Sequence, residues 1–382
     1  MTLARPAVPA DLLEDEPAQI LAPDGQFRPC AELEPYADRT VDFLKRAYAH
    51  MVRSRAFDAE ATSLQRQGEL ALWAPSRGQE GIQVGSALAT PMSDPIIPSY
   101  REHPVAEVRG LDLTRLMGVF RGVNHGGWDP AAHNFHLYTF VIAAHLPHAV
   151  GRALALQQDA RRAGASRSED VVLTYFGDGS TSQGEANEAL VFAASARAPI
   201  VFICQNNGWA ISVPTSVQSI VPLATRPLGF GIPSLRVDGN DPVASYAATR
   251  LALEHARAGR GPFFIEAVTY RMGAHTTSDD PTRYRTSAEE EYWAERCPIA
   301  RTRAALSHEY SVGEDFFEAV DGEADALRRR IRDYTRSLEP VAIETMTEHV
   351  YGTEHAQVRA SHEALAADAD ELDLIAEERK TR

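Results

Sequence analysis

Three apolar runs in the middle of the chain constrain its fold most strongly. They read VVLTYF from residue 171, PIVFICQ from residue 199 and PFFIEAVTY from residue 262. Each run is continuous and rich in β-branched and aromatic residues, which is typical of strands covered on both faces, and helical patterns separate them. The sequence therefore predicts an α/β fold in which helices flank a parallel sheet.

The segment 180–198 lies between the first two runs and predicts a helix. It reads STSQGEANEALVFAASARA, with hydroxyl residues suited to an N-cap followed by strong helix formers. Strand, helix and strand then form one crossover unit, which is right-handed in nearly all known sheets. In such sheets a ligand binds beyond the carboxyl ends of the strands.

Polar residues follow the first two runs at that edge. Asp178 stands between Gly177 and Gly179, which allow the backbone to turn tightly, and Asn206 and Asn207 end the second run. Either tripeptide, GDG or NNG, is by itself also typical of a simple turn. Their spacing, with each directly after an apolar strand, favours one shared site.

The residue types at these two positions indicate a metal and a diphosphate. The carboxylate of Asp178 and the carboxamide of Asn207 are hard oxygen donors. Together with a main-chain carbonyl near Trp209 they would give Mg²⁺ three protein ligands and leave the other positions for phosphate oxygens and water. The helix that begins at Ser180 would offer free N–H groups to the same phosphates.

Composition excludes several other classes of protein. The chain has 38 Lys and Arg against 53 Asp and Glu, and the net charge of -15 disfavours a nucleic-acid surface. No apolar run is long enough to span a membrane, and the first residues resemble neither a signal peptide nor a transit sequence. The three cysteines have neither a disulfide framework nor a metal-ligand spacing, so we expect a cytoplasmic location.

The chain divides into three expected parts. Residues 1–40 are rich in Pro, Ala and acids, and we expect an extended N-terminal arm outside the core. Residues 41–300 should form the α/β domain, including an amphipathic helix from Asp42 to about Gln67 and a small-residue helix in GQEGIQVGSALA from residue 78. Residues 301–382 are charged and helical in pattern, as in a peripheral C-terminal helical region.

The two polar loops together resemble the thiamine diphosphate motif, which runs from GDG to NN; here Asn207 follows Asp178 by 29 positions. The resemblance extends from Asp42 to Trp293 and narrows to the alpha subunit of the decarboxylating component of 2-oxo acid dehydrogenase complexes. PSYREH, LPHAVG, NNGWAISVPT and TYRMGAHTTSDDPTRYR carry it. It implies the diphosphate-binding domain of the thiamine diphosphate-binding fold, with thiamine diphosphate and Mg²⁺ as cofactors.

The resemblance also implies roles for single residues. Asp178, Asn207 and the carbonyl of Trp209 correspond to magnesium ligands; relatives more often carry Tyr at the last position, where only the backbone donates. Gln205 stands where branched-chain relatives often carry Arg. The implied cofactor-binding residues are Tyr100, Arg101, Ile142, Gly177, Gly179, Ser180, Gln183, Arg271 and His275.

His275 is the candidate catalytic residue. A lone histidine is more often structural, but this one stands in a polar, non-periodic loop after a buried strand, a context that favours function. The resemblance places it beside the thiazolium carbon, where it would stabilise the intermediate and transfer protons. Arg271 could hold the diphosphate or order the loop, and Asp279, Asp280, Arg283 and Arg285 are interpreted as loop-ordering charges.

The resemblance implies partners and a substrate class. The chain has one sheet-forming domain, so a separate beta subunit would supply the glutamate that generates the reactive ylid, in an assembly of two alpha and two beta chains. The acyl group would then pass to the lipoyl acyltransferase core. We expect a small 2-oxo acid substrate of the branched-chain type, such as 3-methyl-2-oxobutanoate, with pyruvate and acetoin as the alternatives.

Two other classes fit the sequence less well. An NAD-binding dehydrogenase would need a G-x-G-x-x-G after the first run and an acid at the end of the next strand, and neither is present. A non-catalytic scaffold would not need Asp178, Asn207 and His275.

Overall fold

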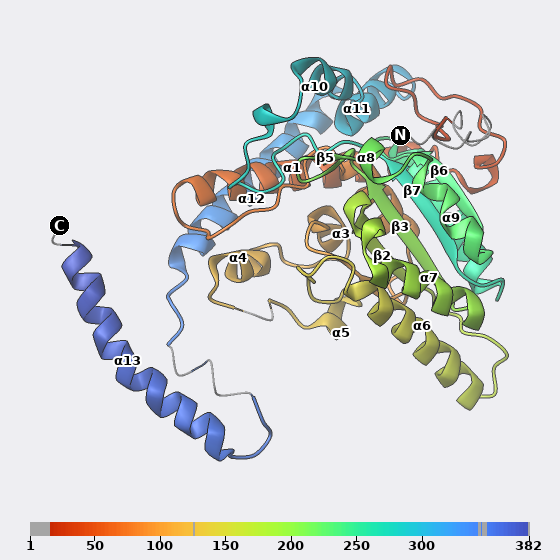
Figure 1. Cartoon of the computed structure of the whole chain (residues 1–382). Helices are drawn as coiled ribbons and strands as arrows, with labels where there is room; N and C mark the ends of the chain where they lie inside the picture. The colour runs from red at the N-terminus through yellow and green to blue at the C-terminus, as the bar shows by residue number, and fades with distance from the viewer. Residues whose placement is uncertain (1–15, 125–126, 343–344, 346–349, 381–382) are drawn as a thin grey trace, which may run out of the picture.

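The computed structural model describes residues 16–124, 127–342, 345 and 350–380, and their centre is a parallel sheet flanked by helices (Figure 1). The three apolar runs form neighbouring strands, as predicted. Two short strands complete the five-stranded sheet found in these residues. Its order is β1 (Ile96–Ile97), β2 (Val172–Gly177), β3 (Ile200–Asn206), β7 (Phe263–Val268) and β6 (Ser234–Asp238), with every pair parallel.

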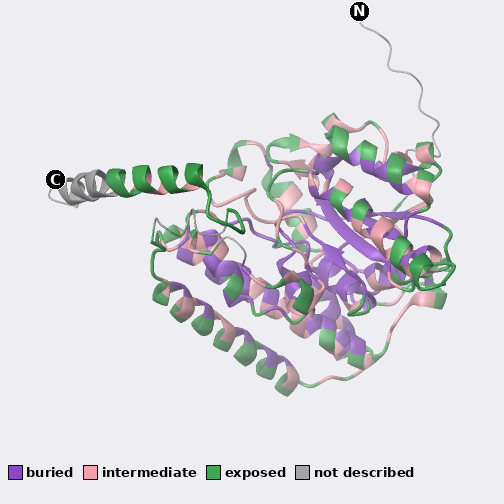
Figure 2. Cartoon of the chain, turned by 90° about the horizontal axis from the view of Figure 1, so that it is seen from below, coloured by how far each residue is buried: buried purple, intermediate pink, exposed green. Residues whose placement is uncertain are grey.

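Both faces of the sheet are covered, which explains why the runs are mostly apolar. Alternate residues of β2 point to opposite sides, so Leu173 and Tyr175 enter one hydrophobic core and Val172 and Phe176 enter another. The first core contains α1 (Val41–Arg66), α2 (Glu80–Ala89) and α9 (Pro242–Arg257). The second contains α6 (His145–Arg162) and α7 (Gly184–Ala196). Figure 2 shows the buried strands between these helical layers.

The crossover from β2 to β3 differs in one detail from the sequence prediction. The hydroxyl residues after Asp178 do not cap the helix; they form the 3-10 turn η3 (Asp178–Ser182), and α7 begins only at Gly184. Gln183 occupies the N-cap without a side-chain hydrogen bond to the helix. The extra turn keeps Gly179 and Ser180 beside the end of the strand instead of inside a helix.

The two helices predicted near the start of the domain are present. In α1 the apolar residues at helical spacing, from Phe43 to Phe57, are buried. In α2 almost every residue is buried, because Gly81 and Gly85 let it approach the start of α9 closely. The remaining helices are α3 (His103–Val108), α4 (Thr114–Arg121), α5 (Pro130–His133), α8 (Thr215–Gln218), α10 (Ser287–Ala294), α11 (Pro298–His308), α12 (Glu314–Ser337) and α13 (Ala356–Lys380).

Shorter elements connect these helices and strands. A two-stranded hairpin, β4 (Trp209–Ala210) with β5 (Val213–Pro214), follows β3. The other 3-10 turns are η2 (Glu34–Tyr36), η4 (Leu223–Thr225), η5 (Pro227–Phe230) and η6 (Pro281–Arg283).

The described part of the N-terminal segment packs on the core, and the expectation that it lies outside the core is wrong there. Ile20, Leu21 and Leu33 are fully buried. The segment bridges to β6, the edge strand, where the N–H of Ala18 donates to the carbonyl of Arg236. Covering an otherwise open strand edge protects its backbone groups.

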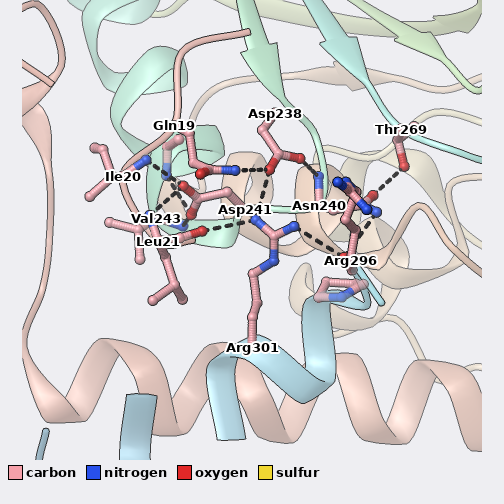
Figure 3. Close-up of polar contacts among 12 residues, drawn as sticks. Gln19, Ile20, Leu21, Asp238, Asn240, Asp241, Val243, Thr269, Arg296 and Arg301 are labelled. Carbon is pink, nitrogen blue, oxygen red and sulfur yellow. Dashed lines mark hydrogen bonds and ion pairs between the residues drawn. The ribbon is translucent and has the colours of Figure 1, made fainter. Parts of the chain in front are cut away.

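A polar cluster fixes this segment against α9 and α11 (Figure 3). The Asp241 carboxylate accepts from the N–H groups of Ile20 at 2.7 Å and Leu21 at 2.6 Å, and it also caps α9. The fully buried Arg301 pairs with Asp238 at 2.7 Å and donates to the carbonyl of Leu21 at 2.9 Å. The cluster therefore joins the N-terminal segment to the end of β6, the start of α9 and α11, which lie far apart in the sequence.

The C-terminal region is helical, as the sequence predicts. Helix α12 packs on α1, where the buried Glu60 accepts two hydrogen bonds from Arg332. Helix α13 extends away from the body of the chain in both views (Figures 1 and 2). The three-part division of the chain stays a prediction. Among the residues described, no helix has both the length and the apolar character needed to cross a membrane.

Candidate active site

A cavity of about 330 Å³ opens at the carboxyl edge of β2 and β3. The strand register aligns Gly177 with Gln205, so the loops that follow both strands reach it. Other walls come from the loop before α3, the start of α6 and the loop after β7. All twelve predicted site residues line this cavity: Tyr100, Arg101, Ile142, Gly177, Asp178, Gly179, Ser180, Gln183, Asn207, Trp209, Arg271 and His275. Their individual roles stay predictions.

Asp178 is a buried carboxylate without a cationic partner. It is 1% exposed, and its Oδ2 accepts from Gln218 Nε2 at 2.9 Å and Thr215 Oγ1 at 3.1 Å. Burial raises the pKa of Asp178, and these two neutral donors oppose the rise. Within the described chain it forms no ion pair with Lys, Arg or His. A buried negative charge of this kind is stabilised by a bound cation.

Asn207 is held in a fixed orientation beside Asp178. Its Nδ2 donates to Gln79 Oε1 at 2.6 Å, and its Oδ1 accepts from the backbone N–H of Trp209 at 3.3 Å. The amide oxygen therefore lies toward the following turn. The carbonyl of Trp209 accepts from Arg271 Nη1 at 3.0 Å, which uses one of its two lone pairs and leaves the other.

Arg101 and Arg271 bring buried positive charge to the cavity. Arg101 donates to the carbonyls of Pro75 and His275, and Arg271 donates to the carbonyls of Trp209 and Ile211. Neither guanidinium forms an ion pair with a carboxylate in the part of the chain that the structure describes. Burial, and then the nearby Arg101 and Arg285, lower the pKa of Arg271 to about 10. Arg271 thus contacts the β4–β5 hairpin, and both guanidinium groups are suited to an anion.

His275 lies between these two guanidinium groups. Its Nδ1 is 3.3 Å from Arg101 Nη2 and 3.4 Å from Arg271 Nη1, and its backbone N–H donates to Asp279 Oδ2 at 2.8 Å. Burial, followed by the two arginine charges, lowers the pKa of His275 to about 3. Since Nδ1 faces donors, the proton of the neutral ring belongs on Nε2. At neutral pH His275 is therefore a hydrogen-bond donor without charge.

The loop that carries His275 is ordered largely as expected. Asp279 also accepts from the hydroxyl of Tyr284, and Asp280 caps η6. Arg285 also orders this loop, because its Nη1 donates to the carbonyl of Gly273 at 2.9 Å. Its guanidinium lies 4.8 Å from the centre of the Tyr270 ring and 4.0 Å from a carboxylate oxygen of Glu290, so an aromatic face contributes as well as an ion pair.

These charges fit a group that combines an anion with a divalent cation. Asp178, Arg101 and Arg271 line the same cavity, and among the described residues none of the three forms an ion pair. Across the described residues there is no group of three or more His, Cys, Asp or Glu that could bind a metal by themselves. A ligand set of one carboxylate, one carboxamide and one carbonyl needs no such group, because a hard cation completes its shell with ligand oxygens and water.

Some residues of the site were missed from the sequence. Gln79 orients Asn207, and Gln218 and Thr215 bind Asp178; each lies more than 30 positions from its partner, so no local pattern indicates the contact. At the cavity floor, Gln205 donates to Glu102 at 2.7 Å and accepts from Gln83 at 2.7 Å. The one sequence signal for this network was that Gln205 stands where branched-chain relatives often carry Arg.

Comparisons with known proteins agree on one family. The family model described as "Dehydrogenase E1 component" matches residues 48–337, a range that includes every residue lining the cavity. The 3-methyl-2-oxobutanoate dehydrogenase subunit alpha of Mycobacterium tuberculosis is 40% identical over 359 residues, 94% of this chain and 95% of that protein. The pyruvate dehydrogenase E1 component subunit alpha of Staphylococcus aureus is 40% identical over 280 residues, 73% of this chain and 74% of that protein.

Proposed function

The chain belongs to the dehydrogenase E1 component family, and from this premise we propose that it is the alpha subunit of a 2-oxo acid dehydrogenase that acts on branched-chain 2-oxo acids. The observation that carries the substrate class is the similarity to the mycobacterial 3-methyl-2-oxobutanoate dehydrogenase subunit, which extends over 94% of this chain. Pyruvate is the second candidate, because the staphylococcal pyruvate dehydrogenase subunit is equally similar over a shorter range.

The family implies thiamine diphosphate as the cofactor, and we propose Mg²⁺ as its metal. Asp178, Asn207 and the carbonyl of Trp209 would hold the ion. When bound, thiamine diphosphate supplies the electron-accepting carbon that lets a 2-oxo acid lose carbon dioxide. The lack of a cationic partner for Asp178 among the described residues supports the metal, because the cation would replace the missing compensation.

Other residues of this chain would bind and orient the cofactor. Tyr100, Arg101, Gly179 and Ser180 would face the diphosphate, since guanidinium and backbone N–H groups are its usual partners. Gly179 also permits β4 to pack closely on η3, because a Cβ at this position would lie 2.9 Å from the Cβ of Ala210. Gly177, Gln183 and Arg271 would complete this part of the wall, and Ile142 would meet the aminopyrimidine through its main chain.

We assign the catalytic role in this chain to His275. Its Nε2–H would donate a hydrogen bond to an oxygen that gains negative charge during the reaction. The ring is held by the backbone bond to Asp279 and lies against Arg101 and Arg271. These contacts keep His275 uncharged, so it would act as a neutral hydrogen-bond donor and not as a cationic acid.

The surface near the cavity mouth is evidence for a partner subunit. Exposed apolar side chains occur in two segments that contribute to its lining, with Phe140 and Val141 next to Ile142 in one and Ile211, Val213 and Val217 in the other; Val141 is 70% and Val217 is 72% exposed. Such a patch favours a protein surface as its cover. We propose that a beta subunit covers it and supplies the ylid-generating glutamate, in an assembly of two alpha and two beta chains that passes the acyl group to a lipoyl acyltransferase core.

Calorimetry of the alpha–beta complex tests the cofactor proposal. Thiamine diphosphate should bind only when Mg²⁺ is present, and Asp178→Ala should abolish binding. Asp280→Ala is the matched control, because this exposed carboxylate caps η6 and does not line the cavity. Binding by Asp178→Ala at the wild-type affinity would refute the metal assignment.

Decarboxylation rates test the substrate proposal. The complex should turn over 3-methyl-2-oxobutanoate with a higher kcat/KM than pyruvate, and the opposite order would select the pyruvate alternative.

A further inference from the structure

The short helix α8 lies over Asp178 and brings two hydrogen-bond donors to the same carboxylate oxygen. Gln218 Nε2 is 2.9 Å from Asp178 Oδ2, and Thr215 Oγ1 is 3.1 Å from it. No other side chain in the described ranges donates to Asp178, so Oδ1 receives no side-chain donor; the backbone N–H groups of Asp178 and Asn207 also interact with the carboxylate and lower its pKa. The two carboxylate oxygens therefore have different surroundings.

Both donors are themselves fixed. Gln218 Oε1 accepts from Ser182 Oγ at 3.3 Å, which leaves its amide nitrogen for Asp178. Arg226 then braces the surrounding backbone, because it donates to the carbonyl of Gln218 at 3.0 Å and to the carbonyl of Thr181 at 2.7 Å. The helix α8 and the turn η3 are thus joined around the carboxylate.

Thr215 has one hydroxyl proton and two acceptors within reach. Its Oγ1 is 3.0 Å from Asn206 Oδ1 and 3.1 Å from Asp178 Oδ2. An ionised carboxylate is the stronger acceptor, because hydrogen bonds to charged groups are roughly twice as strong as neutral ones. Asn206 keeps another partner, since its Oδ1 also accepts from the N–H of Gly208 at 3.3 Å. The Thr215 proton therefore goes to Asp178.

We propose that Gln218 and Thr215 are positioning residues that make Asp178 a one-oxygen ligand and thereby favour Mg²⁺ over Ca²⁺ in the site. The inference rests on the proposed function, because it presupposes that Asp178 binds a divalent cation. Because two side-chain donors occupy both lone pairs of Oδ2, the ion would bind through Oδ1. Mg²⁺ demands a compact octahedral shell in which a carboxylate contributes one oxygen, whereas Ca²⁺ accepts six to eight ligands and often takes both oxygens.

The test is a titration of the alpha–beta complex, saturated with thiamine diphosphate, with Mg²⁺ or Ca²⁺ in a calorimeter. Gln218→Leu removes one donor at similar size, and Thr215→Val removes the hydroxyl with almost no change in shape. Thr215→Ser is the matched control, because it keeps the hydroxyl. Melting temperatures of the variants check that each one folds. If Gln218→Leu does not fold, the comparison of Thr215→Val with Thr215→Ser decides the matter.

We expect the Kd for Mg²⁺ to rise roughly tenfold or more in Gln218→Leu and in Thr215→Val, as is typical when a residue that orients a metal ligand is removed. The Kd for Ca²⁺ should rise much less in these two variants, so their preference for Mg²⁺ should fall. Thr215→Ser should keep the wild-type preference. Wild-type preference in both variants, or equal weakening for the two ions, would overturn the inference while leaving the metal site in place. If neither ion binds to the wild-type complex, the proposed function itself fails.

Discussion

The close approach of α2 to α9 gives a prediction whose size follows from the structure. Gly85 lies in the middle of α2, and a Cβ at this position would stand 2.5 Å from the carbonyl oxygen of Pro242 and 2.8 Å from the Cβ of Ser245. Neither atom is the end of a flexible side chain, so one helix must move. Gly85→Ala should therefore destabilise the chain although alanine is the better helix former.

Two opposing free energies set the magnitude. Alanine in place of glycine inside a helix stabilises by about 1 kcal/mol. Overpacking a rigid contact costs about 1–3 kcal/mol, and a clash with backbone belongs near the upper end. The expected net loss in the free energy of unfolding is about 2 kcal/mol. Such a loss raises the unfolded fraction roughly thirtyfold.

Gly322 provides the control. It lies in the exposed part of α12, and a Cβ there would meet no heavy atom within 4 Å. Gly322→Ala should stabilise the chain by about 1 kcal/mol, since only helix propensity changes. The two variants should thus change the free energy of unfolding in opposite directions.

Urea denaturation followed by tryptophan fluorescence measures both changes. A Gly85→Ala variant as stable as wild type, or stabilised like Gly322→Ala, would refute the contact geometry. The site offers a second measurement, because residues in and next to α2 orient its side chains. Gln83 in α2 donates to Gln205, and Gln79, which precedes α2, accepts from Asn207. A shift of α2 should therefore also weaken the proposed binding of Mg²⁺.

Further predictions concern His275 and the polar cluster of Figure 3. The imidazole of His275 should stay neutral, with its proton on Nε2, between about pH 5 and 8 in ¹⁵N NMR spectra; titration near the ordinary value of 6.5 would contradict its surroundings. Because its folded pKa is lowered to about 3, the stability it contributes is full above pH 6.5 and is lost as the pH falls toward 3, and His275→Gln should remove that part of the pH dependence. Arg301→Met should cost about 3 kcal/mol, because it leaves the Asp238 carboxylate and the Leu21 carbonyl without their buried partner. Limited proteolysis should then cut first within residues 17–33, and an unchanged cleavage pattern would show that the cluster does not hold this segment.

The sequence was sufficient for the sheet and for the position of the site. The apolar runs of β2, β3 and β7 are local signals, and strands buried on both faces leave few arrangements other than a parallel sheet. Since parallel strands end at one edge, Asp178 and Asn207 were expected to meet there, and they line one cavity. The presence of β6 as an edge strand and the start of α7 at Gly184 were not expected, because neither has a strong local pattern.

The amino-acid sequence by itself determined which segments become strands and helices, and it placed a carboxylate and a carboxamide after two of them, because side-chain pattern and backbone preference act within a few residues. Only the tertiary structure decided which distant residues hold the functional and structural polar groups in place. Gln79 reaches Asn207 across 128 positions, Arg101 reaches His275 across 174, and Leu21 reaches Asp241 across 220. Such partners meet through the packing of whole elements, whose register and approach depend on contacts summed over the entire core.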